Sequence, residues 1–248
     1  MTEVIVFIFG LIFGSFLNVV IYRLNVGSFG RSRSFCPDCN HQLSWWDNIP
    51  VVSFLLLAGR CRYCKKNISI QYPLVELGTA LILVWLYTEL GISQVFFLYA
   101  IFAFFLVVIF TYDLRYYLIA DEVTIPAMIV AFVGNIFLGA DPLSLVTGAV
   151  LGGGFFSVQY LVSSGRWIGG GDIRLGAVMG LMLGWQVTII ALFIGYVVGA
   201  AVGLTLIAVK KKKLGSQLPF GTFLSGATLI ALIYGRNIYD WYISTLGF

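Results

Sequence analysis

The four cysteines of the chain form two C-x-x-C pairs, Cys36 with Cys39 and Cys61 with Cys64, separated by residues 40–60. Each pair can supply two thiolates, and the intervening loop can bring the pairs together around one tetrahedral ion, which is typical of a four-cysteine zinc site. Four protein ligands leave no open coordination position, so the pattern predicts a structural zinc ion. Basic neighbours are expected to lower the thiol pKa and to offset the thiolate charge; they are Arg60, Arg62, Lys65 and Lys66.

Two aspartates border apolar stretches, which is unusual for a carboxylate. Asp113 follows the run VFFLYAIFAFFLVVIFTY, and Asp172 follows GGG and precedes IRLGAVMGLMLG. An ionisable group that faces lipid is costly, so both side chains are expected to face the interior of a helical bundle. Two carboxylates at one depth can share a proton, one acting as base toward a water and the other as acid toward a carbonyl oxygen. The alternative is that Asp113 pairs with Arg115 and Asp172 with Arg174 as solvated charges, and spacing alone favours this alternative.

The neighbouring sequence allows three further expectations. The glycines 169–171 permit the close approach of a substrate backbone and a non-helical backbone lining a wet cavity. Asp121, in DEVTIP, is expected to cap the helix that follows it. Glu76, at the start of an apolar stretch, is explained by snorkelling or by a helix N-terminal role.

The composition places these residues in a membrane protein. The chain has 248 residues, of which 60% are hydrophobic and only 10% charged, whereas about a quarter of a soluble domain is charged; its mean hydropathy is +0.96. Eight apolar stretches are expected to span the membrane, roughly at 4–22, 74–88, 95–112, 123–139, 143–163, 173–185, 186–209 and 219–235.

Two of these stretches have special features. The first stretch lacks a basic N-terminal region and is long enough to span a bilayer, so we expect a retained helix rather than a signal peptide. The sixth stretch is short and rich in glycine, which is compatible with a helix that is tilted, broken or continuous with the seventh.

The distribution of basic residues predicts the orientation. With eight spans, fourteen of the fifteen Lys and Arg residues fall on one side, and only Arg236 falls elsewhere. The positive-inside rule makes this side cytoplasmic and puts both termini outside. The fourteen are Arg23, Arg31, Arg33, Arg60, Arg62, Lys65, Lys66, Arg115, Arg166, Arg174 and Lys210 to Lys213. The sequence therefore predicts an all-α polytopic membrane protein with about eight transmembrane helices and a small zinc-bearing cytoplasmic loop domain.

The predicted side bears on the cysteines. Disulfides are disfavoured in the reducing cytosol, which leaves redox-active dithiols and free thiols as the alternatives to zinc. His41, the only histidine, is interpreted as a surface residue rather than a ligand. The net charge of +4 is explained by orientation, so no nucleic-acid partner is expected.

Several motifs, in order, resemble the type IV prepilin peptidase family, and the resemblance covers nearly the full length. The motifs are GSFLNVVIYRL (14–24), CPDC with HQLSWWDNIPVVS (41–53), GRCRYC, YPLVEL (72–77), YDLRYYLIADEVTIP (112–126), GGGDIRLGAVMGLMLGW (169–185) and LPFGTFLSGA (218–227). The resemblance implies a GxGD-type aspartic endopeptidase of the bacterial inner membrane, with Asp113 and Asp172 as the catalytic pair. It also implies cleavage of a basic leader from prepilins or pseudopilins after a glycine. Many members then methylate the new N-terminal amine using S-adenosylmethionine.

The resemblance implies a division into a first transmembrane helix (1–24), a loop domain with the four cysteines (25–72) and a peptidase domain (73–248). Relatives without the cysteines typically lack methylation, so this chain resembles the bifunctional type. The family's Gly-basic pair corresponds to Gly59 and Arg60, which we expect either to serve the methyl donor or to fold the zinc loop. No G-x-G-x-x-G follows a strand, and GGGFF (152–156) is interpreted as close helix packing.

The chain departs from the family pattern at two places. LPD is replaced by Ile-Ala-Asp at 119–121, and PFGP by Pro-Phe-Gly-Thr at 219–222. Neither departure is expected to touch the aspartate pair. Three alternative functions remain: a peptidase without methyltransferase activity, a transporter using both aspartates for proton coupling, and a membrane thiol oxidoreductase, which would need its cysteines on the oxidising side.

Overall fold

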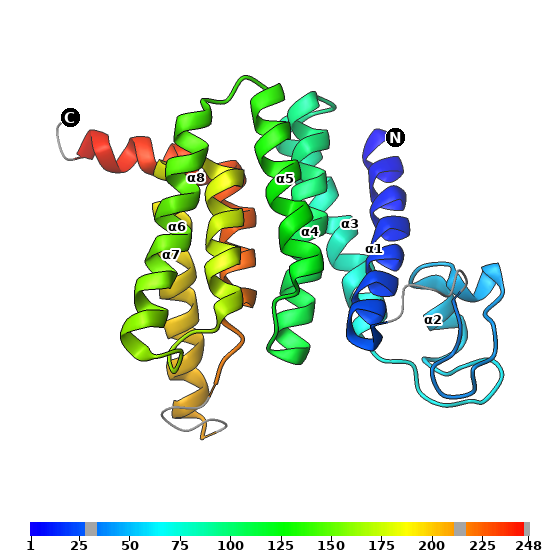
Figure 1. Cartoon of the computed structure of the whole chain (residues 1–248). Helices are drawn as coiled ribbons and strands as arrows, with labels where there is room; N and C mark the ends of the chain where they lie inside the picture. Colours follow the sequence, from blue (N-terminus) through cyan, green and yellow to red (C-terminus); the bar gives the residue numbers. More distant parts are fainter. Residues whose placement is uncertain (28–33, 211–216, 246–248) are drawn as a thin grey trace. The chain divides into compact units, whose positions relative to one another are not determined.

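The computed structural model describes residues 1–27, 34–210 and 217–245, and its regular structure there is helical apart from isolated bridges. Arg31, Arg33 and Lys211 to Lys213, used above to predict the orientation, lie outside the described residues. In chain order (Figure 1) the elements are α1 (Thr2–Val26), the 3-10 helix η1 (Trp45–Asn48), α2 (Val52–Leu56), α3 (Gln71–Leu90), α4 (Gln94–Tyr116), α5 (Asp121–Phe137), α6 (Pro142–Ser163), α7 (Gly170–Ala208) and α8 (Phe220–Thr245).

Five helices of the described chain are long and apolar enough to cross a membrane: α1, α3, α4, α6 and α7. The predicted all-α class is therefore confirmed for the described residues, with five helices as candidate membrane spans. The stretches predicted at 123–139 and 219–235 also form helices, but α5 has only 17 residues and α8 carries Arg236 and Asp240 in its C-terminal half.

The chain forms two compact units, residues 1–96 and 97–248. In the first unit, α1 packs against α3 through small residues. Gly10 lies against Ala80, and a Cβ placed on Gly14 would be 2.6 Å from the Cα of Glu76. Helices in lipid gain little from hydrophobic burial against each other, so close backbone approach of this kind is a main source of their association. The buried Asn18 adds a hydrogen bond from its Nδ2 to the Tyr72 carbonyl, 3.0 Å away.

In the second unit, α6 packs on the N-terminal part of α7 through glycines on both helices. Gly152 lies against the backbone of Gly176, and Gly148 against that of Gly180. The interpretation of GGGFF as a packing segment is therefore confirmed at Gly152.

Helix α7 turns back on itself at Gly184, whose φ of 73° and ψ of 169° are not helical. A Cβ on Gly176 would lie 2.7 Å from Phe156 Cδ2, and the ring of Tyr196 also stacks on Phe156 at 6.4 Å between centroids. In a straight helix, residues 176 and 196 would be about 30 Å apart. The first arm of α7 (170–183) and the second arm (185–208) therefore run side by side in opposite directions (Figure 1), and the boundary predicted between 185 and 186 lies at this turn.

Replacing Gly152 with Ala should destabilise the second unit, because the added methyl would collide with the backbone of Gly176. Overpacking of this kind costs about 1–3 kcal/mol. Gly154→Ala on the same helix is the matched control, since a Cβ there meets nothing within 4 Å and alanine favours the helix. Thermal unfolding in detergent should show a lower midpoint for Gly152→Ala only; equal midpoints for the two variants would contradict this account of the packing.

Candidate functional site

The structure brings the four cysteines together. Their sulfurs all lie within 4.8 Å of one another, and Cys36 Sγ is 3.9 Å from Cys64 Sγ. All four are free of disulfides. A tetrahedral ion with sulfur ligands at about 2.3 Å separates those sulfurs by about 3.8 Å. The predicted meeting of the two pairs is confirmed, and the cluster fits a metal ion held by four thiolates.

The two C-x-x-C segments have the same local structure, a repeat that the sequence reasoning missed. In each, the carbonyl of the first cysteine accepts a hydrogen bond from the amide four positions later, Asn40 to Cys36 at 2.8 Å and Lys65 to Cys61 at 3.0 Å. Asn40 and Lys65 both have left-handed backbones, with φ of 55° and 62°. An isolated antiparallel bridge flanks each turn. We call these segments the first and second knuckles (36–40 and 61–65).

The knuckle backbone favours the thiolate form of Cys61. Burial of this thiol opposes its ionisation, but hydrogen bonds from the amides of Cys64 and Tyr63, together with those from the thiols of Cys64 and Cys36, lower its pKa to about 7. The same thiol contacts raise the pKa of Cys64, and burial raises that of Cys36.

The expectation that basic side chains lower the thiol pKa is not borne out at Cys61, because the lowering there comes from backbone and thiol hydrogen bonds. Lys66 pairs with Asp38 at 2.9 Å and is close enough to Cys64 for their charges to interact, whereas Arg62 is engaged elsewhere.

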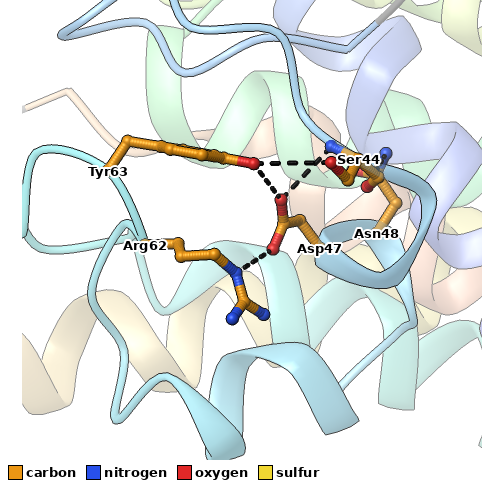
Figure 2. A network of polar contacts seen from close by, with 5 residues as sticks. All are labelled: Ser44, Asp47, Asn48, Arg62 and Tyr63. Carbon is orange, nitrogen blue, oxygen red and sulfur yellow. Dashed lines mark hydrogen bonds and ion pairs between the residues drawn. The ribbon is translucent and has the colours of Figure 1, made fainter.

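Arg62 belongs to a polar network around Asp47 that joins η1 to the second knuckle (Figure 2). Arg62 Nε donates to Asp47 Oδ1 at 2.7 Å, and the Tyr63 hydroxyl donates to Oδ2 at 3.1 Å. The Ser44 amide also donates to Oδ2, at 3.2 Å. Burial alone would raise the pKa of Asp47, but these hydrogen bonds and the Arg62 charge hold it below its usual value. The ionised carboxylate of Asp47 thus ties the segment between the knuckles to the second knuckle.

His41 is exposed and lies on the ring of Tyr63, with 3.6 Å between centroids. This placement agrees with the interpretation of His41 as a surface residue.

Gly59 and Arg60 form the turn that leads into the second knuckle. Gly59 has a left-handed backbone with φ of +68°, and its carbonyl accepts the Ile68 amide at 2.7 Å. Arg60 forms a bridge with Asn67 and its side chain is exposed. The backbone of the pair is engaged in folding the loop, and the two residues alone form no cradle for a methyl donor.

Glu76 has a role that neither snorkelling nor a helix N-terminus explains, so that prediction is wrong. It is only 6% exposed and accepts the amide of Val51 at 2.7 Å. Val51 has a φ of 62°, which is rare for a β-branched residue. The carboxylate therefore holds a strained backbone at the start of α2. The only cue in the sequence was a lone acidic residue inside an apolar helix, which gives no hint of its partner.

Asp113 lies near the C-terminal end of α4, is 5% exposed and is bound by the first turn of α8. The Thr222 amide donates to Asp113 Oδ2 at 2.7 Å, and the Thr222 hydroxyl donates to the same oxygen at 3.1 Å. The backbone of Gly221 is a further hydrogen-bond partner of this carboxylate. The expectation that the PFGT departure does not touch the aspartate pair is therefore wrong.

Asp172 is 7% exposed and caps the first turn of its own helix. Its Oδ2 accepts the amide of Gly169 at 3.0 Å, and its amide donates to the Gly169 carbonyl at 3.2 Å. Gly169 is extended, whereas Gly170 and Gly171 are already helical. The expected non-helical backbone is thus limited to the residue before the helix.

Asp113 and Asp172 belong to the same unit, and the side chain of Ile119 lies against Gly171, beside Asp172, and against Gly221, which contacts Asp113. A Cβ on Gly171 would lie 2.8 Å from Ile119 Cβ, and one on Gly221 would lie 2.9 Å from Ile119 Cδ1. The two aspartates are close enough for the charge of Asp113 to act on Asp172. The arrangement brings two buried carboxyl groups together, as paired acid and base catalysis requires.

The alternative ion pairs do not describe these aspartates. Arg174 pairs with Asp121 rather than with Asp172, and the guanidinium of Arg115 lies 5.5 Å from the ring centroid of Tyr116. The prediction for Asp121 is also wrong: it is the first residue of α5, follows the cap residue Ala120, and no side-chain cap is formed.

Comparison with known proteins extends over almost the whole chain. Residues 8–90 match the bacterial peptidase A24 N-terminal domain, and residues 100–204 match the type IV leader peptidase family. A protein of Aeromonas salmonicida is 35% identical over 98% of this chain and 94% of its own length. A protein of Pseudomonas putida is 34% identical over 97% and 93%, and one of Legionella pneumophila 32% over 96% and 93%. All three are named prepilin leader peptidase/N-methyltransferase. No solved structure matches significantly.

The cysteine cluster predicts that the protein binds a metal ion and that all four thiolates are needed to retain it. Purified protein should carry about one metal ion per chain, and Cys61→Ser should lose most of it because three sulfurs hold the ion less tightly. His41→Ala is the control, since His41 contacts Tyr63 rather than the cluster. Elemental analysis of the three proteins checks this, and equal metal content in all of them would rule out the cluster as the binding site.

Proposed function

The chain belongs to the type IV leader peptidase family, and from this membership we propose that it cleaves the leader peptide of type IV prepilins or pseudopilins and then N-methylates the new N-terminal residue. The relatives that carry both activities in their name match over more than nine-tenths of this chain. The observation that carries the peptidase proposal is that two buried carboxyl groups of one unit, Asp113 and Asp172, lie within range of each other's charge.

The proposed cleavage uses the two aspartates to hold one water. One carboxylate takes a proton from the water as its oxygen attacks the scissile carbonyl carbon, and the other carboxyl group gives its proton to the carbonyl oxygen. The tetrahedral intermediate then collapses and the peptide C–N bond breaks. The proton taken from the water passes to the leaving nitrogen, and the hydroxyl formed from the carbonyl oxygen returns its proton to the second carboxylate. A substrate whose apolar helix lies in the bilayer and whose basic leader lies in the cytosol would present its scissile bond at this depth.

The proposed topology has eight crossings, with the two arms of α7 counted separately. A straight helix of 39 residues would be about 58 Å long, nearly twice the thickness of the hydrocarbon core, so a turn at Gly184 is what a membrane of ordinary thickness requires. The bias of Lys and Arg then supports a bacterial inner-membrane protein with both termini outside and with the knuckles and aspartates on the cytoplasmic side. The proposed functional division is residues 1–24, 25–72 and 73–248.

Zinc is the ion that we propose for the cysteine cluster, as a structural element of the loop. Four sulfurs within 4.8 Å of one another suit this ion, and a site closed by four protein ligands leaves it no role at a substrate.

S-adenosylmethionine is the methyl donor that we propose, and it would supply the methyl group for the new N-terminal amine. Gly59 fits a role in folding the loop, while the exposed guanidinium of Arg60 is the part of this pair that is accessible to an anionic group of the donor. The presence of the cysteine-bearing loop supports a bifunctional enzyme over a peptidase alone.

Asp113→Asn and Asp172→Asn should each lower leader cleavage by about a thousandfold or more, because general acid–base catalysis contributes on this order. The measurement is cleavage of a prepilin in detergent or in vesicles. Asp240→Asn, on the exposed C-terminal part of α8, is the matched control. If either active-site variant still processes prepilin, the dyad proposal fails. A transporter would be indicated instead by proton-coupled uptake that both variants lose.

Arg60→Ala should reduce methylation while cleavage and metal content are retained. Lys65→Asn is the control, because Lys65 is an exposed basic residue close to Arg60 in the chain. Its backbone is left-handed, a conformation that asparagine readily adopts. Asn40 has the same conformation at the equivalent position of the first knuckle. Mass spectrometry of the processed pilin N-terminus provides the readout. Undiminished methylation by the Arg60→Ala protein would remove this residue from the methyl-donor site.

A further inference from the structure

The two carboxyl groups of the pair differ in the hydrogen-bond donors around them. Asp113 accepts the Thr222 amide at 2.7 Å and the Thr222 hydroxyl at 3.1 Å on one oxygen, and the backbone of Gly221 is a third partner. Asp172 accepts a single backbone amide, that of Gly169 at 3.0 Å. The donors of Asp113 come from a helix that lies 109 residues away in sequence, whereas the donor of Asp172 comes from its own turn.

Donors that point at a carboxylate favour its charged form. The amides of Gly221 and Thr222 belong to the first turn of α8, where backbone N–H groups have no partner inside the helix and the helix dipole favours a negative charge. The Thr222 hydroxyl has one proton and a second acceptor, the Phe110 carbonyl at 3.4 Å. The bond to the carboxylate is shorter and charge-assisted, so it is the favoured one.

The remaining titratable groups near the pair add no hydrogen-bond donor to either carboxylate among the contacts described. Tyr196, on the second arm of α7, interacts with Asp172, and Arg174, two residues after Asp172, is paired with Asp121. Tyr112, one residue before Asp113, interacts with Tyr116 and Glu122. When Asp113 is ionised, its charge disfavours a second charge on Asp172.

We propose that Thr222 is a positioning residue that holds Asp113 ionised and oriented, so that Asp113 takes the proton from the water and Asp172 gives its proton to the carbonyl oxygen. This assignment rests on the proposed peptidase function and adds the division of roles. It is a property of this chain, because a proline at position 222, as in the PFGP pattern of the family, has neither the N–H nor the hydroxyl.

The test is the pH dependence of kcat/KM for leader cleavage by the full-length enzyme. Thr222→Val keeps the shape of the side chain and removes the hydroxyl, so Asp113 needs a higher pH to lose its proton. The acidic limb of the profile should therefore move to higher pH by about one unit, which is a loss of about tenfold below that limb. Thr222→Ser, which restores the hydroxyl, should return the limb toward its original position, and Thr222→Pro, which removes both donors, should move it further.

Thr228→Val is the matched control. Thr228 is a buried threonine of the same helix, and its hydroxyl donates to the Leu224 carbonyl of that helix at 2.7 Å, so its profile should be unchanged. The assignment would be overturned if the acidic limb of the Thr222→Val profile did not move. It would also be overturned if only the basic limb moved, since that outcome makes Asp113 the acid. Activity that survives in Asp113→Asn would instead overturn the peptidase proposal itself. Metal content and thermal unfolding of each variant confirm that the protein is folded.

Discussion

The need to supply donors for buried carboxylates governs the arrangement of the second unit. Asp113 and Asp172 are both almost inaccessible to water, and an unpartnered carboxylate in such a place would be strongly destabilising. The partner comes from a helix N-terminus in each case: the first turn of α8 for Asp113, and Gly169, the residue before α7, for Asp172. The same free amides that helices present at their N-termini thus allow two acidic groups to remain close together inside an apolar bundle.

In the first unit, backbone amides likewise act as hydrogen-bond donors to side chains that can carry a negative charge, here a thiol and two carboxylates. The amides of the second knuckle point at Cys61, and Asp47 and Glu76 each bind a backbone amide of the same loop. Between residues 34 and 70, where the loop is described, its helices are the short α2 and η1, so the order of this part depends on these polar contacts and on the cysteine cluster more than on a hydrophobic core.

Features encoded locally were predictable from the sequence. The meeting of the four cysteines follows from two C-x-x-C pairs, and the long apolar runs mark the helices, including the division of α7 near Gly184. The contacts that depend on packing between distant helices were not predictable. Thr222 reaches Asp113 only because α8 begins beside the end of α4, and Arg174 pairs with Asp121, rather than with Asp172 close by in the sequence, because α5 begins beside α7. A lone threonine after Pro-Phe-Gly, or a lone glutamate in YPLVEL, carries no signal of its partner when only the chain order is known.

The turn at Gly184 also determines on which face of the bundle the later chain emerges. Each reversal of direction brings the chain back toward the end of the unit from which it came. The number of reversals between Asp172 and Thr222 therefore decides whether α8 begins at the end of the unit where Asp113 lies. A sequence that let α7 continue straight would deliver the start of α8 to the opposite end of the unit, and Asp113 would then lack its donors although every residue around it was unchanged. The arrangement around Asp113 thus depends on one glycine that lies at the opposite end of the first arm of α7 from Asp172.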